Sequence, residues 1–197
     1  IDFTIREVKR IGKHAQGTIA YTTSPVHDLN TWLDLAKKIE DAGADSLAIK
    51  DMAGLLRPFD AFELVKNLKS TLSIPIHMQT HATTGMSTAT NMKAIEAGID
   101  NIDTSISSLS MTYGHTATET MLAIFENQER EISLDLSALE EVSSFFKEIR
   151  DKYSEFEGNL RGVDSSMLVK QVPGGMLSNL ESQLRANKQE DKIDLVK

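Results

Sequence analysis

The chain has 197 residues, of which 40% are hydrophobic and 25% are charged, as is usual for a globular protein. Its 29 acidic residues outnumber 21 basic ones, and the net charge of -8 argues against nucleic acid as a partner. Without cysteine, disulfides, thiolate nucleophiles and cysteine metal sites are excluded. No apolar run approaches the roughly 20 residues of a membrane span, and residues 1–10 lack the apolar core of a signal peptide. We therefore expect a cytoplasmic protein without direct membrane insertion.

Short apolar runs recur at intervals of about 28 residues, close to the roughly 30 residues of a strand followed by a crossover helix. These runs, which we predict to be strands, are residues 17–22, 45–50, 74–79 and 101–106. Amphipathic segments lie between them. Asp28 or Asn30 is suited to cap the first helix, Pro58 to open the second, and a third lies between Ser87 and Gly98. This alternation predicts an α/β fold with a parallel sheet, and unusual residues after the strands are typical of a (β/α) barrel.

The second half of the chain has a different pattern. The pattern of residues 134–156 predicts one long amphipathic helix, because apolar residues recur at every third or fourth position. A turn-rich stretch follows at residues 172–176, and residues 183–197 are polar and helical in pattern. The chain starts at Ile1 and stops at Lys197 within charged segments, so we expect a piece of a longer protein.

Lys50, at the end of the second predicted strand, is the first candidate for chemistry. Desolvation at the mouth of a barrel favours the neutral amine, which can act as a nucleophile, form a Schiff base or accept carbon dioxide. An ion pair with Asp51 or Asp103 is the structural alternative.

The third predicted strand has an unusually polar face, because His77, Gln79 and His81 are in phase. Gln79 and His81 are candidate metal ligands, and His81 is a candidate general base, although a lone histidine is more often structural. The serine-rich segment 105–110 indicates turns rather than a nucleophile. The sequence contains no Gly-x-Ser-x-Gly elbow, phosphate loop or dinucleotide fingerprint.

Several motifs follow one another along the chain. They are Ile49–Leu56 (IKDMAGLL), His81–Gly85 (HATTG), Lys93–Gly98 (KAIEAG), Asp103-Thr104 with Ser107-Ser108, and Pro173–Leu180 (PGGMLSNL). Together they resemble the carboxyltransferase domain of biotin-dependent enzymes. This family includes the oxaloacetate decarboxylase α subunit, the carboxyltransferase part of pyruvate carboxylase and the pyruvate-side subunit of transcarboxylase.

The resemblance implies a (β/α)8 barrel with a metal at the carboxyl ends of its strands. In the family an aspartate, a carboxylated lysine and a His-x-His pair hold this metal. Lys50 lies in the lysine motif, His81 matches the second histidine, and Gln79 stands in place of the first. Met52 is implied as a lining residue of the substrate pocket. A carbamate beside imidazole suits Zn, Mn or Co, whereas a neutral amide is a weaker ligand, which puts metal occupancy in question.

The same resemblance implies that this chain is incomplete. The aspartate ligand and the substrate-binding Gln and Arg of the family lie upstream of Ile1, and a proton-shuttling threonine lies beyond Lys197. A complete barrel needs about 250 residues. We therefore predict a partial TIM barrel over residues 1–157, lacking its N-terminal strands, and the start of a helical C-terminal extension over residues 158–197. No turnover is expected of the 197 residues alone.

The implied reaction is biotin-dependent carboxyl transfer between a keto acid (oxaloacetate or pyruvate) and carboxybiotin, most like that of the oxaloacetate decarboxylase α subunit. Biotin is expected on a separate carrier domain or subunit, and the family suggests a homodimer. Two alternatives stay open. The chain could belong to an inactive scaffold homologue whose metal site is broken at Gln79, or to a metal-dependent Claisen-type synthase or lyase, which does not need a carboxylated lysine.

Overall fold

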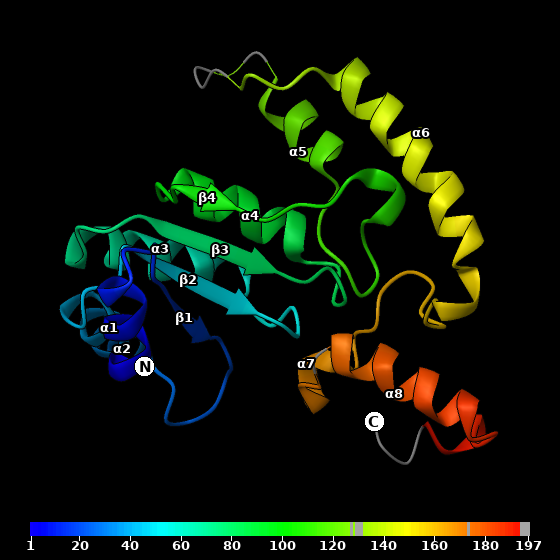
Figure 1. The fold of residues 1–197 in the computed structure, drawn as a ribbon, viewed down its shortest axis with the longest axis horizontal. Coiled ribbons are helices and arrows are strands. Elements are labelled where there is room, and N and C mark those ends of the chain that lie inside the picture. Colours follow the sequence, from blue (N-terminus) through cyan, green and yellow to red (C-terminus); the bar gives the residue numbers. More distant parts are fainter. Residues whose placement is uncertain (127, 129–131, 173, 194–197) are drawn as a thin grey trace. The chain divides into compact units, whose positions relative to one another are not determined.

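The computed structural model describes residues 1–126, 128, 132–172 and 174–193 (Figure 1). Four strands form a parallel sheet in the order β1-β2-β3-β4, which confirms the predicted α/β class. The elements are α1 (Asp2–Arg10), β1 (Gln16–Ala20), α2 (Leu29–Asp41), β2 (Ser46–Asp51), α3 (Pro58–Thr71), β3 (Ile76–Thr80), α4 (Ser87–Glu96), β4 (Asn101–Ile102), η1 (Ser107–Leu109), α5 (Thr118–Phe125), α6 (Leu136–Lys152), η2 (Ser154–Phe156), α7 (Met167–Lys170), α8 (Gly174–Ala186) and η3 (Glu190–Lys192).

The chain divides into two compact units. The first comprises residues 1–80 and 89–103, and the second comprises residues 81–88 and 104–197. The predicted boundary between a barrel at 1–157 and an extension at 158–197 is a division of another kind, and it stays a prediction.

In the first unit the predicted helix signals have the expected roles. The Asp28 side chain accepts a hydrogen bond from the Thr31 amide at 2.8 Å, which caps the first turn of α2. Pro58 is the first residue of α3. Gly43 follows α2 with a φ of 93°, a conformation that favours glycine at the end of a helix.

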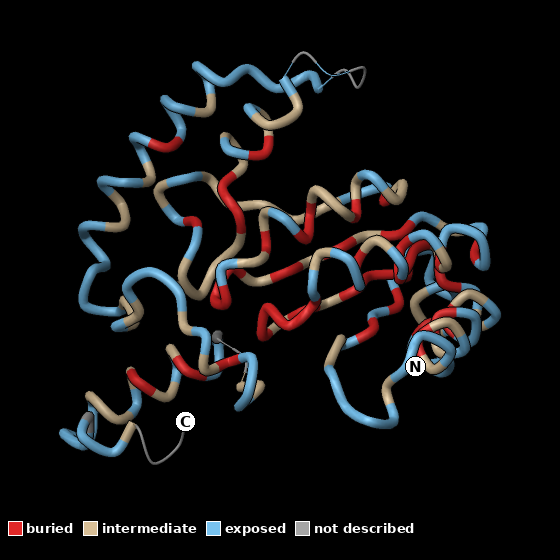
Figure 2. Tube along the Cα trace, turned by 180° about the vertical axis from the view of Figure 1, so that it is seen from behind, coloured by how far each residue is buried: buried red, intermediate tan, exposed pale blue. Residues whose placement is uncertain are grey.

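Helices cover one face of the sheet, and the strands contain many of the buried positions (Figure 2). Ile19, Ile49 and Met78 are at most 1% exposed and belong to a single apolar core with residues of α2 and α3. Burial of each such side chain contributes about 1.5–3 kcal/mol. Gly17 lets α2 approach closely, since a Cβ there would lie 2.1 Å from Ile39 Cγ2.

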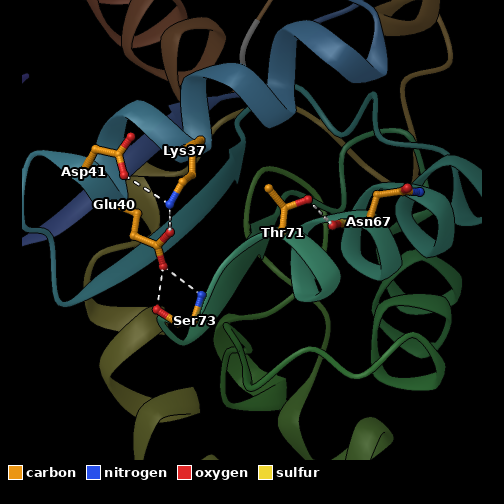
Figure 3. A network of polar contacts seen from close by, with 6 residues as sticks. All are labelled: Lys37, Glu40, Asp41, Asn67, Thr71 and Ser73. Carbon is orange, nitrogen blue, oxygen red and sulfur yellow. Dashed lines mark hydrogen bonds and ion pairs between the residues drawn. The ribbon is translucent and has the colours of Figure 1, made fainter.

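A polar network joins the end of α2 to the loop before β3 (Figure 3). The Glu40 carboxylate binds Lys37 Nζ at 2.7 Å, and its other oxygen accepts hydrogen bonds from the amide and the hydroxyl of Ser73. These contacts hold the pKa of Glu40 at about 2, chiefly through Lys37 and then through the Ser73 amide.

The fourth strand is shorter than predicted. It covers Asn101–Ile102 rather than residues 101–106. The Asp103 amide still bonds to the carbonyl of Met78, but the Ser105 amide bonds instead to the carbonyl of Thr116. The chain therefore leaves the sheet because its backbone groups find partners in a loop.

In the second unit the predicted helix 134–156 is observed as α6, followed by the short helix η2. Part of its apolar face is exposed, since Leu136 is 45% and Val142 is 43% exposed. Helix α8 begins at Gly174, so the prediction of turns over residues 172–176 is wrong at its C-terminal end. Of the predicted polar helix 183–197, the part through Ala186 lies in α8, and residues 194–197 lie outside the described residues. Within the described residues, no helix has the length and apolar character needed to cross a membrane.

Candidate active site

Lys50 and Gln79 lie side by side at the carboxyl ends of β2 and β3, where they are partners in the parallel register. Both residues are half-buried: Lys50 is the one residue of β2 that is not buried, and Gln79 alternates with buried residues along β3. Because successive strand residues point to opposite faces, Lys50 and Gln79 extend from the face opposite the helices. In a closed barrel this is the face that lines the interior.

The next residues of the two strands, Asp51 and Thr80, are also register partners, and both are buried. The fully buried Asp51 carboxylate accepts hydrogen bonds from the amides of Leu55 and Leu56, at 2.8 and 2.9 Å, and from Thr80 Oγ1 at 2.9 Å. The bonds to the two amides close the loop that follows β2. This loop contains Met52, which is half-buried.

Both carboxylates suggested as ion-pair partners of Lys50 are engaged elsewhere. Asp51 binds the loop and Thr80, as described, and one oxygen of Asp103 lies 2.6 Å from His77 Nε2. His77 lies on the same face as Gln79, one layer nearer the start of β3. The buried role of Asp51 was not apparent in the sequence, where it is one charged residue beside another.

His81 belongs to the second unit and has a defined tautomer. Its Nδ1 lies 2.6 Å from the carbonyl oxygen of Tyr113, and this contact requires a proton on Nδ1. The lone pair of the neutral ring is therefore on Nε2. Metal-binding histidines commonly have this arrangement, in which the second ring nitrogen donates to a backbone carbonyl. His81 therefore fits the role of a metal ligand.

Tyr113 connects His81 to helix α8. Its hydroxyl donates to Glu181 Oε1 at 3.0 Å, and Glu181 is 6% exposed. Burial raises the pKa of Tyr113 above its usual value, and the hydrogen bond to Glu181 and its charge add to this effect. The tyrosine is thus held in its neutral, donating form.

A second imidazole lies against His81. The ring centroids of His81 and His115 are 4.6 Å apart, with the ring planes inclined at 46°. The sequence analysis missed His115, because it occurs alone in a loop and shares no strand face with another candidate.

A metal at this site would need ligands beyond the usual acidic and imidazole side chains. The described residues contain no group of three or more His, Cys, Asp or Glu side chains placed to hold a metal ion. Within the first unit a carbamate on Lys50 or the amide of Gln79 could supply oxygen ligands, and within the second unit His81 could supply an imidazole.

A separate cavity of about 250 Å³ lies in the first unit between α2 and α3. Its lining includes Tyr21, His27, Trp32, Asp60 and Glu63. Burial, followed by the charge of Asp60, raises the pKa of Tyr21 to about 12.

Comparisons with known proteins agree with this architecture. A family model described as HMGL-like matches residues 2–146. The chain belongs to the HMGL-like family. It is 48% identical over 191 residues to the methylmalonyl-CoA carboxyltransferase 5S subunit of Propionibacterium freudenreichii subsp. shermanii, covering 96% of this chain and 38% of that protein. It is 43% identical over 197 residues to a pyruvate carboxylase subunit of Methanocaldococcus jannaschii, covering 100% of this chain and 35% of that one.

Among solved structures, the carboxyl transferase domain of Rhizobium etli pyruvate carboxylase matches with a TM-score of 0.91 and 32% identity, covering 97% of this HMGL-like chain and 33% of that chain. The same domain with pyruvate and biocytin also matches with a TM-score of 0.91. These matches confirm the resemblance to carboxyltransferase domains and the fold class of a partial TIM barrel. The chain spans well under half the length of these relatives.

Proposed function

We propose that the protein containing this chain catalyses biotin-dependent carboxyl transfer between a 2-oxo acid and carboxybiotin. The placement of Lys50 carries the proposal. It lies at the carboxyl end of a parallel strand, on the face opposite the helices, in register with Gln79. A lysine so placed can take up carbon dioxide and present an anionic oxygen toward a barrel interior. The family membership and the carboxyltransferase and carboxylase names of the relatives support the same chemistry.

In this proposal Lys50, as a carbamate, and His81 hold a divalent metal, Zn, Mn or Co, with Gln79 as a weaker ligand. When bound, such a metal supplies a Lewis acid that stabilises the enolate of the 2-oxo acid. Other residues of this chain position the proposed ligands. Tyr113 fixes the His81 tautomer, while Asp51 and Thr80 hold the strand ends that carry Lys50 and Gln79. Met52, on the loop closed by Asp51, is proposed to line the substrate pocket.

The names of the relatives support the proposed substrate class. Their names include pyruvate carboxylase and, in Hydrogenobacter thermophilus, a 2-oxoglutarate carboxylase large subunit that is 33% identical to this chain. We propose pyruvate and oxaloacetate as substrates, with biotin on a carrier domain or subunit and a homodimeric assembly. Oxaloacetate decarboxylase in particular stays a prediction, because the relatives compared are carboxyltransferases and carboxylases.

The test uses the full-length protein with a biotinylated carrier. Wild type is expected to decarboxylate oxaloacetate only when biotin is present, and Lys50→Ala to lower this rate by about 100-fold or more because a ligand is lost. Exposed Lys66 provides the control substitution Lys66→Ala. Carbon-13 bicarbonate should give a carbamate NMR signal that disappears in Lys50→Ala. Full activity in that variant would refute the proposal, and biotin-independent condensation chemistry would favour the Claisen-type alternative.

The inactive-scaffold alternative rests on Gln79 alone. It predicts that the full-length protein neither retains metal nor transfers carboxyl groups, and that Gln79→His restores metal binding. The same measurements therefore separate it from the active enzyme.

A further inference from the structure

We propose that the cavity between α2 and α3 binds an organic ammonium group, either of a free small amine or of a lysine side chain of a protein partner. All of the residues that line this cavity belong to the first unit. The inference is independent of the proposed function, because the cavity includes none of the residues of the candidate active site.

The lining of the cavity has an acidic side and an aromatic side. Asp60 and Glu63 are three residues apart on α3, so they are neighbours on the surface of this helix. The aromatic rings come from Tyr21 and His27, in the segment that follows β1, and from Trp32 of α2. A ligand in the cavity therefore meets two carboxylates and an aromatic surface at the same time.

The three aromatic side chains form one continuous group. The ring centroids of His27 and Trp32 are 4.9 Å apart, and their planes are nearly parallel, at 12°. The Tyr21 centroid lies 5.5 Å from that of Trp32, with the planes inclined at 33°. Ser24 Oγ is 2.7 Å from His27 Nδ1 and holds the imidazole against the indole. Aromatic rings attract cations, and aromatic cages are a common means of binding alkylammonium groups.

The two carboxylates are available to a ligand. Within the described residues, neither Asp60 nor Glu63 forms an ion pair or a side-chain hydrogen bond, and both residues are exposed. Their side of the cavity is negative. After burial, the charges of Asp60 and Asp51 raise the pKa of Tyr21, and the weaker effect of Arg57 opposes them. The cavity therefore favours a cation.

The size and the atoms of the cavity limit the kind of cation. Its volume of about 250 Å³ is below the roughly 300–1,000 Å³ of pockets for drug-sized ligands, so it suits a small ion or a single side chain. Calcium takes about six to eight oxygen ligands, whereas half of this lining is aromatic or aliphatic. An alkylammonium group uses both sides, because its N–H groups donate to the carboxylates and its carbon atoms pack against the rings.

The cavity lies at the edge of the sheet where the strands end. Tyr21 follows β1 directly, and its amide donates a 2.9 Å hydrogen bond to the carbonyl of Lys50. Helix α3, which carries both carboxylates, follows the loop that Asp51 closes after β2. A protein partner that approaches this edge of the sheet therefore meets the cavity, which is why a lysine of such a partner is one source of the ammonium group.

The test measures binding of butylammonium and of N-acetyl-lysine amide to the full-length protein by ligand-observed NMR at constant ionic strength. Asp60→Asn combined with Glu63→Gln is expected to weaken binding of both probes by about 10-fold or more, because the charged acceptors are lost. Glu140→Gln combined with Glu141→Gln is the matched control, since it removes two charges from exposed residues of α6. Tyr21→Leu should weaken binding by about 2–5-fold, whereas Tyr21→Phe keeps an aromatic ring and should bind nearly as wild type does.

Tighter binding of N-acetyl-lysine amide than of butylammonium would support a lysine side chain as the source of the ammonium group, and equal or weaker binding would support a free amine. If neither probe binds saturably, the inference is wrong. Equal weakening in the Asp60/Glu63 and Glu140/Glu141 double variants would also overturn it, because net charge alone would then explain the binding. Carboxyl transfer is assayed separately, so either result leaves the proposed function to its own test.

Discussion

The hydroxyl of Thr80 donates a 2.9 Å hydrogen bond to the buried carboxylate of Asp51, and the two residues are partners in the register of β2 and β3. Each comes directly after a candidate site residue, Lys50 or Gln79. The bond on the helix-covered face therefore sets the register of the pair on the other face.

Asp51→Ala is expected to destabilise this region by about 3 kcal/mol, because two backbone amides and one hydroxyl lose a buried acceptor. Thr80→Val removes one of the three bonds and should cost about 1 kcal/mol. Amide hydrogen exchange of residues 52–56 in the full-length protein measures the effect. Equal protection in wild type and Asp51→Ala would show that the carboxylate does not hold the loop.

Gln79→His is expected to raise the affinity for Zn²⁺ or Co²⁺ by about 10–100-fold, because imidazole replaces a neutral amide beside Lys50. Gln16→His places a histidine at the start of β1 and serves as the control. Metal content after purification and chelator competition measure the change. If Gln79→His and Gln16→His bind metal equally, position 79 does not face the metal.

Tyr113→Phe removes the hydrogen bond to buried Glu181 and is expected to cost about 1–3 kcal/mol, since the carboxylate keeps the Asn159 amide as a partner but loses a donor. Tyr153, which is 60% exposed, provides the control Tyr153→Phe. Exchange of the amides around Tyr113, and the NMR tautomer signals of His81, report the change. A mobile His81 ring in Tyr113→Phe, with Tyr153→Phe unchanged, is the expected result.

Acid should weaken the contacts of Glu40, whose pKa is lowered from 4.5 to about 2 (Figure 3). A lowered pKa in the folded state stabilises the fold above pH 4.5, and this contribution is lost as the pH falls from about 4.5 to about 2. Glu40→Gln should therefore be less stable than wild type at pH 7, by about 1–2 kcal/mol, and nearly equal to it at pH 2. Thermal midpoints across this range test the sign, and a difference that grows in acid would contradict it.

Gly17→Ala tests the close packing of β1 and α2. The added Cβ would lie 2.1 Å from Ile39 Cγ2, and such overpacking costs about 1–3 kcal/mol. Because Ile39→Ala removes the clashing group, it should cost less in the Gly17→Ala background than the roughly 2–5 kcal/mol expected in wild type. Gly175→Ala is the control: a Cβ there meets nothing within 4 Å, and because Gly175 lies in α8 the change should not destabilise and should add up to about 1 kcal/mol.

The sequence by itself determined the local elements of this protein and singled out its motif residues. The Asp28 cap, Pro58 at the start of α3 and the apolar periodicity act within a few residues, so they can be read without a partner segment. Lys50, Gln79 and His81 were recognisable for the same reason, since their motifs are continuous. Where local signals were mixed, as at Gly174, the predicted turn was in fact the start of a helix.

Only the tertiary structure decided which of these residues meet. The register of β2 and β3 places Lys50 beside Gln79, and it depends on how two strands pair rather than on either strand alone. The Asp51 side chain is buried on the face of the sheet opposite Lys50, where it meets its register partner Thr80. The contact of His115 with His81 depends on a loop closed by backbone hydrogen bonds, which carry no side-chain signature. Contacts between distant segments arise from packing, and local sequence patterns do not show which segments pack together.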